Sequence, residues 1–295
     1  MRTYTKHAAP EEITAEYAGL MELGEAAEHG GAPTVRVMRR EGSEMETALL
    51  AHASPTRAAA EAFGRRLAHT HAYAPTGKRL FGQAPALLAG PNPPAYSMDP
   101  SRLHLVPADS EPRTWGEMYA ADFIEPFIAP ALRNGAFSQA DAALMHRLAD
   151  RVATGMFDAP QPALVTTDAA LLHGDLWSGN VFWTTAASAR EAARGTWNGT
   201  TDETEAEGTA GDGVVAVLID PISHGGHAET DLAALTVFGA PFVDRIYAAY
   251  NEESPLADGW EERVGLHRIH MLVLHAALFG GGYGQETVAQ ARAYL

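Results

Sequence analysis

The sequence predicts an α+β protein with two lobes, a small β-rich lobe over residues 1–53 and a larger, mainly helical lobe over residues 54–295. The first segment holds stretches rich in β-branched residues, and one of them has the pattern of a hairpin that turns at residues 40–44. The second segment holds long runs with apolar residues at helical spacing. Inside it, apolar stretches flank a polar loop within residues 171–183, which indicates a loop between two strands.

In the first lobe, a strand is predicted at residues 2–6 and an amphipathic helix at residues 13–31. The strand ends on Lys6, and Glu16 lies in the first turns of the helix. A strand lysine followed by a helix glutamate is the arrangement in which an ion pair holds the lysine over nucleotide phosphates. A surface lysine beside an unrelated acidic side chain is the alternative interpretation.

The predicted helices of the second lobe begin at capping residues, Ser54, Thr114 and Ser138. The helix from Ser54 carries His69 and His71 on different sides, so solvation near the helix end is expected there rather than a metal site. The helix from Thr114 is expected to kink near its prolines, Pro126 and Pro130, and to end at Gly135.

Two segments are predicted to be irregular. Residues 74–113 are rich in proline, glycine and alanine, and we expect a long connection with at most a short hairpin. Residues 184–213 are acidic and rich in threonine and glycine, with little to bury. This second segment is predicted to be a flexible hairpin insertion between two strands.

The bulk composition excludes several classes of function. Acidic residues outnumber basic ones by 37 to 21, and the resulting net charge of −16 argues against binding of nucleic acid or of an anionic membrane surface. The absence of cysteine excludes disulfides, thiolate metal sites and cysteine nucleophiles. No apolar run approaches the ~18 residues of a membrane span, and the first residues lack the apolar core of a signal peptide. The cytoplasm is the expected compartment by default.

The polar loop carries the most informative residues of the chain. Asp175 and Asn180 follow His173 within it, and Asp220 ends a later apolar run. In phosphoryl-transfer enzymes one aspartate accepts the proton of the attacking hydroxyl, while an asparagine and a second aspartate hold Mg²⁺. The pattern therefore predicts a magnesium–nucleotide site, with Asp175 as a simple turn residue the alternative.

Other groupings were weighed against this one. His267 and His270 are three residues apart and can share a helix face, but no carboxylate stands at a matching spacing, which favours packing over metal binding. A metallohydrolase site built on His173, Asp175, Asp220 and His224 is a further alternative. That alternative gives no role to Asn180, Lys6 or Glu16.

Four stretches, HGDLWSGN, IDPISHGGHAETDLA, AAYNEESPLADGWEERV and LHAALFGGGYG, together resemble the fructosamine kinase (ketosamine-3-kinase) family. The resemblance covers nearly the whole chain and is strongest from residue 114 onward. It implies the protein-kinase-like fold in its aminoglycoside-phosphotransferase variant, with ATP and Mg²⁺ as cofactors.

The resemblance also implies roles for individual residues on the nucleotide side. Asp175 is expected to be the catalytic base, and Asn180 and Asp220 the ligands of Mg²⁺. Lys6 is expected to bind the phosphates with Glu16 as its ion-pair partner.

On the substrate side, the resemblance implies that Trp177 forms a wall of the sugar site. Glu229 is expected to contact the substrate or to brace its loop. His173 and Asp231 are expected to support the loop that carries the base. Ala228 stands where the family has an arginine, which alters the expected charge balance beside Glu229.

A second departure from the family lies at the start of the sequence. Five residues precede Lys6, whereas the family begins with a glycine-rich hairpin over the nucleotide phosphates. A misassigned start, a shortened kinase with weakened ATP binding, and a non-catalytic member are the alternatives. The missing strands are expected to expose a sheet edge.

The function implied is ATP-dependent phosphorylation of a sugar hydroxyl on a ketosamine of the fructosamine or ribulosamine type, free or attached to a glycated protein lysine. An acidic pocket beside Trp177 is expected to suit the cationic amine of such a substrate. The alternatives are an aminoglycoside- or choline-type small-molecule kinase and a catalytically impaired pseudokinase. Nucleic-acid and membrane partners are not expected, and the protein is expected to be a monomer or a weak dimer.

Overall fold

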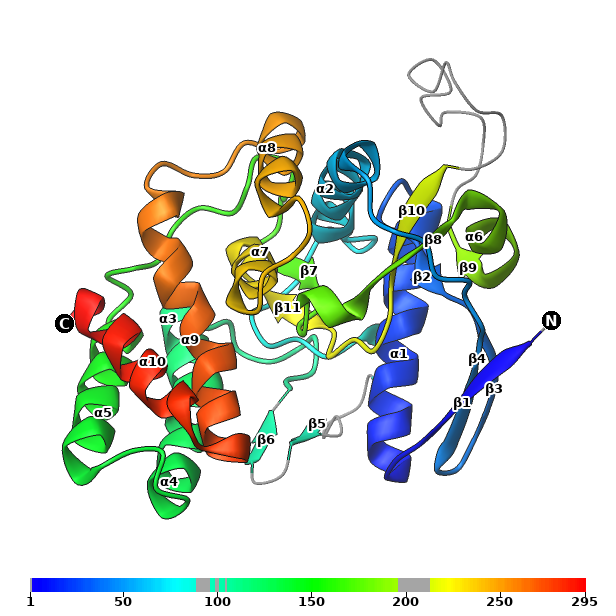
Figure 1. Ribbon diagram of the computed structural model, residues 1–295. Coiled ribbons are helices and arrows are strands. Elements are labelled where there is room, and N and C mark those ends of the chain that lie inside the picture. The colour runs from blue at the N-terminus through cyan, green and yellow to red at the C-terminus, as the bar shows by residue number, and fades with distance from the viewer. Residues whose placement is uncertain (1, 89–95, 99–100, 104, 196–212) are drawn as a thin grey trace.

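The computed structural model describes residues 2–88, 96–98, 101–103, 105–195 and 213–295 (Figure 1). Helices gather on the side of the C-terminus, and a small sheet stands at the opposite side with the N-terminus (Figure 1). Within the part of the chain that is described, no helix is long and apolar enough to cross a bilayer.

The first sheet is three-stranded, with the order β1-β4-β3 and antiparallel pairing throughout. It contains β1 (Thr3–His7), β3 (Val37–Glu41) and β4 (Glu44–Ala48), so the predicted strand and hairpin are confirmed. Helix α1 (Pro10–Glu28) begins earlier than predicted, at a proline. Proline is accepted in the first turn because the N–H that it lacks would have no partner within the helix there. Its apolar face packs onto Met45 of this sheet and Val217 of the next.

The second sheet joins segments that are distant in sequence. Its order is β8-β10-β2-β9, with β10 antiparallel to β8 and parallel to β2. The strands are β2 (Thr34–Val35), β8 (Val181–Thr185), β9 (Ala193–Arg194) and β10 (Val214–Leu218). Because β2 precedes residue 53, this sheet contains strands from both predicted segments.

The interpretation of residues 184–213 as one flexible insertion is wrong for its first part. Residues 184–185 complete β8, helix α6 (Ala186–Ala192) follows, and β9 then pairs with β2. Ala189, Ala192 and Ala193 are buried, so small side chains that look like low complexity are the ones that fit a close helix–sheet contact. Residues 196–212 lie outside the described residues.

Two short sheets complete the strands. One pairs β7 (Ala170–Leu172) with β11 (His224–Gly226), and the other is the hairpin of β5 (Tyr96–Met98) and β6 (Ser101–Leu103) that was allowed for within residues 74–113. Single-turn 3₁₀ helices occur at η1 (Ala86–Leu88), η3 (Ser178–Asn180) and η4 (Arg292–Tyr294).

Helix α2 (Arg57–Ala72) begins at a different cap from the one predicted. Thr56, not Ser54, is the N-cap, and its side chain accepts a hydrogen bond from the N–H of Ala59. Its Gly64 lies against α8 (Val243–Glu253), where a Cβ would overlap the backbone oxygen of Ile246. The two helices therefore approach each other closely at this glycine.

The long helix predicted from Thr114 is divided as expected. Thr114 forms a capping box with Glu117, and α3 (Trp115–Met118) passes into a π-helical stretch, η2 (Tyr119–Ile124), before α4 (Glu125–Arg133). Proline lacks the N–H that continues the α-helical ladder, which accounts for the break next to Pro126. Ser138 caps α5 (Gln139–Ala153) as predicted.

Four α-helices follow β11: α7 (Ala228–Val237), α8, α9 (Trp260–Phe279) and α10 (Gly282–Ala291). Helices α9 and α10 pack with α3, α4 and α5 in the largest core cluster, whereas α7 and α8 pack with α2 and the strands in a second cluster. In the largest cluster, Trp115, Tyr119 and Ile128 pack with Leu266 and Val273 of α9. Met271 of α9 belongs to the second cluster with Ala170 and Leu172 of β7, which places α9 beside the strand that leads into the polar loop.

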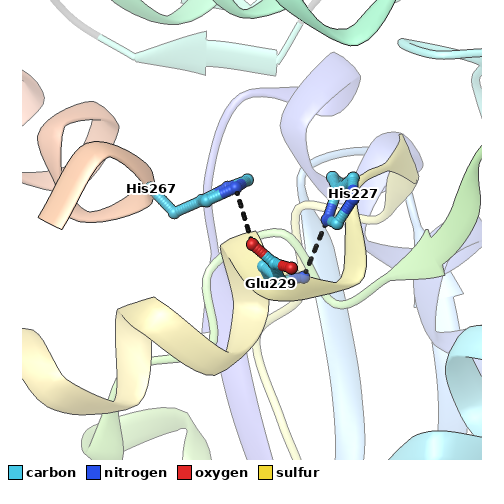
Figure 2. Close-up of side chains that lie close together, drawn as sticks. All are labelled: His227, Glu229 and His267. Carbon is cyan, nitrogen blue, oxygen red and sulfur yellow. Dashed lines mark hydrogen bonds and ion pairs between the residues drawn. The ribbon is translucent and has the colours of Figure 1, made fainter. Parts of the chain in front are cut away.

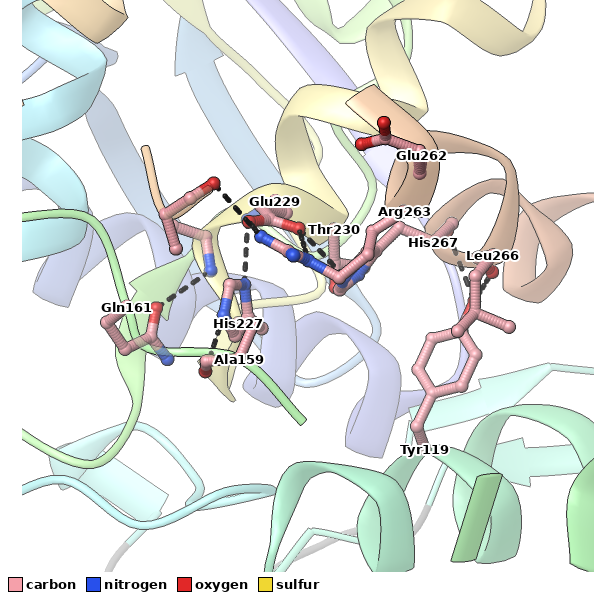
Figure 3. A network of polar contacts seen from close by, with 12 residues as sticks. Tyr119, Ala159, Gln161, His227, Glu229, Thr230, Glu262, Arg263, Leu266 and His267 are labelled. Atoms are coloured by element: carbon pink, nitrogen blue, oxygen red, sulfur yellow. Dashed lines mark hydrogen bonds and ion pairs between the residues drawn. The ribbon is translucent and has the colours of Figure 1, made fainter. Parts of the chain in front are cut away.

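A buried polar network holds α7 against α9 around Glu229, which is only 4% exposed (Figures 2 and 3). The guanidinium of Arg263 donates to both carboxylate oxygens, at 2.6 and 2.9 Å. His267 Nε2 lies 3.3 Å from Glu229 Oε2, and its Nδ1 is 2.9 Å from the hydroxyl of Thr230. Arg263 therefore supplies the positive charge that Ala228 cannot.

These contacts change the ionisation of the buried groups. Burial alone would raise the pKa of Glu229, but the hydrogen bonds from His267 and Arg263 outweigh it and lower the pKa to about 2. Burial lowers the pKa of His227 to about 4, with a further contribution from His267. At neutral pH Glu229 is therefore an anion and His227 is neutral.

The network predicts a specific acid dependence of stability. The pKa of Glu229 is about 2 in the folded protein against an ordinary value of 4.5. A depressed folded pKa contributes stability that is present above the unfolded pKa and is lost as the pH falls through the folded pKa. We expect a contribution of roughly 3 kcal/mol from this group to disappear between about pH 5 and pH 2.

Urea unfolding of the wild type and Glu229→Gln over this pH range measures that contribution. Glu229→Gln should unfold more easily at pH 7 and lose less stability on acidification than the wild type. Glu286→Gln is the matched control, because Glu286 is exposed and pairs with Arg268 at the surface. Equal acid slopes for the wild type and Glu229→Gln would contradict the assignment.

Candidate active site

The polar loop between β7 and β8 brings the predicted residues together. The amide nitrogen of Asn180 donates to the backbone oxygen and to Oδ2 of Asp175, both at 2.8 Å. Asn180 is itself buried and ends the short turn η3. The loop therefore holds the carboxylate of Asp175 in one orientation.

Lys6 lies between two carboxylates. Its Nζ is 2.7 Å from Glu16 Oε2, so the predicted ion pair is present, and 3.0 Å from Asp220 Oδ1. Asp220 follows β10 with φ of +51°, in the left-handed region that non-glycine residues rarely adopt. The lysine thus connects the first sheet, α1 and the end of β10.

One positive charge, that of Lys6, lies next to two acidic side chains, Glu16 and Asp220. Burial would lower the pKa of Lys6, but Glu16 and Asp220 outweigh it and raise the pKa. Burial raises the pKa of Glu16 to about 7, although Lys6 opposes the shift. The nearby charge of Asp220 adds to the effect of burial, so Glu16 gains a proton at a higher pH than an ordinary glutamate does.

Asp175 lies at the mouth of a mostly apolar pocket. Burial raises its pKa to about 7; the hydrogen bond from Asn180 opposes the shift, and the nearby charges of Asp231 and Asp220 add to it. The prediction of an acidic pocket is wrong. Asp175 is the only acidic residue among the described residues that line it, and the helices and the β10–β11 loop supply mainly apolar side chains. The pocket is lined by Gly174, Asp175, Phe123, Phe127, Ile222, His270, Met271 and Leu274.

Asp231, near the start of α7, anchors the polar loop because its side chain binds the backbone of that loop. Its Oδ2 accepts from the N–H of His173 at 2.7 Å, and its Oδ1 accepts from the N–H of Gly174 at 3.0 Å. Gly174 has φ of +85°, and a Cβ there would overlap the backbone oxygen of Ile222. His173 donates from Nε2 to the backbone oxygen of Ile219 at 2.9 Å.

His71 belongs to the same anchor, and the prediction of a solvated helix-end histidine is wrong for it. It is buried, its Nε2 lies 3.3 Å from Asp231 Oδ2, and its Nδ1 lies 2.9 Å from the hydroxyl of Tyr250. The spacing of apolar residues along α2 could have predicted that His71 is buried. His71 continues the buried face of α2 formed by Ala60, Phe63, Gly64 and Leu67.

Trp177 is 36% exposed and packs edge-on against Phe238, with ring centres 5.7 Å apart. A Cβ on Gly179 would overlap the indole, so glycine is required for this packing. Trp177 stands two residues after Asp175 but is not part of the pocket lining. Its exposed face is available on the surface next to the loop.

Glu229 does not occupy an open substrate site. Together with His227 and His267 it has the ligand atoms of a possible metal site, all within 4.8 Å of one another (Figure 2). The atoms that could bind a metal already take part in hydrogen bonds, however. His227 Nδ1 accepts from the N–H of Glu229 at 3.2 Å, and both carboxylate oxygens of Glu229 accept from Arg263. A cation there would have to displace the partly buried Arg263 from Glu229, so we assign the cluster to structural support.

The metallohydrolase alternative fails for a similar reason. His173 donates from Nε2 to a backbone oxygen, and its Nδ1 accepts from the N–H of Asp175 at 3.3 Å. His224 Nδ1 is bonded to the backbone oxygen of Ile222 at 2.7 Å, and its Nε2 has no partner in the part of the chain that the structure describes. Among the described residues, however, His224 does not come within metal-ligand distance of a group of acidic or histidine side chains. Asn180 and Asp220 instead offer amide and carboxylate oxygens, the donor set that Mg²⁺ prefers.

Comparison with known proteins agrees with this geometry. A family model described as fructosamine kinase matches residues 3–295. A solved structure from Thermobifida fusca, of a candidate fructosamine-3-kinase, is 30% identical with a TM-score of 0.72. The alignment covers 99% of this chain and 85% of that one.

Curated relatives match over shorter segments. A protein of Lactiplantibacillus plantarum named "Probable ketoamine kinase" is 28% identical over 170 residues, which are 58% of this chain and 49% of the relative. The mouse ketosamine-3-kinase is 33% identical over 114 residues, which are 39% of this chain and 28% of the mouse protein. The chain thus spans about half the length of the first relative and less of the second. From the family match across almost its whole length, this chain belongs to the fructosamine kinase family.

Proposed function

We propose that this protein transfers a phosphoryl group from ATP to a sugar hydroxyl of a ketosamine. The proposal rests on one observation: the structure contains both a positioned aspartate at a pocket and a lysine fixed between two carboxylates. Asp175, held by Asn180, faces a pocket, and Lys6 is held between Glu16 and Asp220. Membership of the fructosamine kinase family supports the reaction class.

We propose a protein-kinase-like, two-lobed arrangement for the fold. Residues 1–53, which carry Lys6 and Glu16, would form the nucleotide lobe. Residues 54–295, which carry the polar loop and the pocket, would form the substrate lobe. The second sheet, where β2 meets β10, would be the connection between the lobes.

Asp175 is suited to act as the general base. A base works best when its pKa is near the working pH, and burial raises the pKa of Asp175 to about 7. The proton of the sugar hydroxyl would pass to Asp175 while the hydroxyl oxygen forms a bond to the γ-phosphorus. The bond from phosphorus to the ADP oxygen would break in the same step.

Lys6 is suited to bind the phosphates, because its ammonium is already fixed next to Asp220 by the ion pair with Glu16. The amide oxygen of Asn180 and the carboxylate of Asp220 would hold Mg²⁺. That ion, when bound, neutralises charge on the transferring phosphoryl group. The roles of Lys6 and Glu16 are therefore electrostatic and positional.

The proposed acceptor is a ketosamine of the fructosamine or ribulosamine type, either free or on a glycated protein lysine. The name of the mouse relative, ketosamine-3-kinase, supports this class. Trp177 would present its indole to the sugar, while His173 and Asp231 would keep the loop in place. We propose that the protein acts as a monomer or a weak dimer in the cytoplasm.

The role of Asp175 can be tested by substitution. Asp175→Asn keeps the size and the contact with Asn180 but cannot accept the proton, so ketosamine-dependent ATP consumption should fall at least ~100-fold. Asp168→Asn, at an exposed aspartate before β7, should keep wild-type turnover. Equal turnover by Asp175→Asn and the wild type would exclude this residue as the base.

The raised pKa values predict how the rate depends on pH. Both Asp175 and Glu16, each with a pKa of about 7, must be ionised, the first to accept a proton and the second to hold Lys6. Hence kcat/KM for the ketosamine should rise with pH up to about 7 and fall about tenfold or more per pH unit below it.

Glu16→Gln separates the two groups. If an acid limb of about tenfold per pH unit persists in Glu16→Gln, it belongs to Asp175. A rate that does not change between about pH 5.5 and 8 in the wild type would contradict both assignments.

A further inference from the structure

A cluster of aromatic rings extends outward from Trp177. Phe238 contacts Trp177 on one side and His275 on the other, with ring centres 5.7 and 4.9 Å apart. His275 in turn lies 5.2 Å from Tyr283 and 5.4 Å from Phe279. We call the set Phe238, His275, Phe279 and Tyr283 the aromatic platform.

Two members of the platform are too exposed to be explained by folding alone, whereas Tyr283 packs partly against the largest core. Phe279 is 68% exposed and Phe238 40% exposed, and neither belongs to a buried core cluster. Large apolar side chains gain little stability when most of their surface stays in water. Several of them gathered on one surface, rather than scattered singly, are typical of a binding surface.

The platform is continuous with the candidate active site. Trp177 joins it to the polar loop two residues after Asp175. On α9, His275 directly follows Leu274, which lines the pocket at Asp175. A substrate whose hydroxyl reaches Asp175 would therefore have the platform close to the rest of the molecule.

The platform carries no formal charge at neutral pH. Burial lowers the pKa of His275 although the hydrogen bond that its Nδ1 donates to the backbone oxygen of Met271, at 2.8 Å, opposes the shift, so the ring is neutral at neutral pH. The remaining members are phenylalanines and a tyrosine. Such a surface favours apolar groups, and aromatic faces also attract cations.

We propose that the aromatic platform binds the substituent on the amine of the ketosamine, and that it selects substrates in which this substituent is apolar or aromatic. The sugar would lie at Asp175 and Trp177, and the positively charged amine would lead from the sugar onto the ring faces. This specificity rests on the proposed function, since it concerns the other end of the same substrate.

The test compares two fructosamines that share the sugar and the charged amine, one made from methylamine and one from phenethylamine. The wild type should phosphorylate the phenethylamine derivative with the higher kcat/KM. Phe279→Ala should reduce that preference about five- to tenfold and leave kcat/KM for the methylamine derivative unchanged. Because Phe279 is largely exposed, its truncation leaves the fold intact.

Met156→Ala removes another exposed apolar side chain, one outside the platform, and should keep the preference. Phe238→Ala provides a second platform variant with the same expected result. Phosphorylation of both fructosamines without a preference, unchanged in Phe279→Ala, would overturn the platform and leave the proposed function standing.

Calorimetric titration with both fructosamines in the absence of ATP separates the two proposals. Tighter binding of the phenethylamine derivative that is lost in Phe279→Ala, without phosphorylation of either compound, would support the platform and refute the proposed function. Equal binding of the two compounds by the wild type and by Phe279→Ala would overturn the platform.

Discussion

The site depends on one buried carboxylate, that of Asp231. It accepts the N–H groups of His173 and Gly174, which shapes the loop that carries Asp175, and it is held in turn by His71 from α2. Hydrogen bonds from His71 and these backbone groups keep the pKa of Asp231 low despite its burial, which would otherwise raise it. A buried charge without such partners would be very costly, so the loop, α2 and α7 are bound to one geometry.

A second constraint acts along the same helix. Glu229 ties the start of α7 to α9 through Arg263 and His267, and α9 also supplies part of the pocket wall. The anchor of the loop and the wall of the pocket are therefore built on helices that cannot shift independently. Catalysis of phosphoryl transfer rests mainly on positioning and electrostatic stabilisation. The buried polar contacts would supply the positioning of Asp175 that the proposed function requires.

The sequence predicts the parts of the site that lie in one motif or at the ends of adjacent elements. Asp175 and Asn180 lie five residues apart, and Lys6 and Glu16 lie on a strand and the helix that follows it. Contacts between distant elements could not be predicted in this way. Arg263 is 34 residues from Glu229, and the pocket is apolar because helices distant in sequence supply its wall. Composition also misled where small side chains pack closely, as at the alanines of α6 and β9.

The central claim is that a sugar hydroxyl next to Asp175 receives the phosphoryl group. The most direct measurement is mass spectrometry and ³¹P NMR of the products after incubation with Mg-ATP and a fructosamine. The account predicts a sugar phosphate ester formed in equal amount to ADP. Release of ADP with inorganic phosphate and an unchanged fructosamine would contradict it.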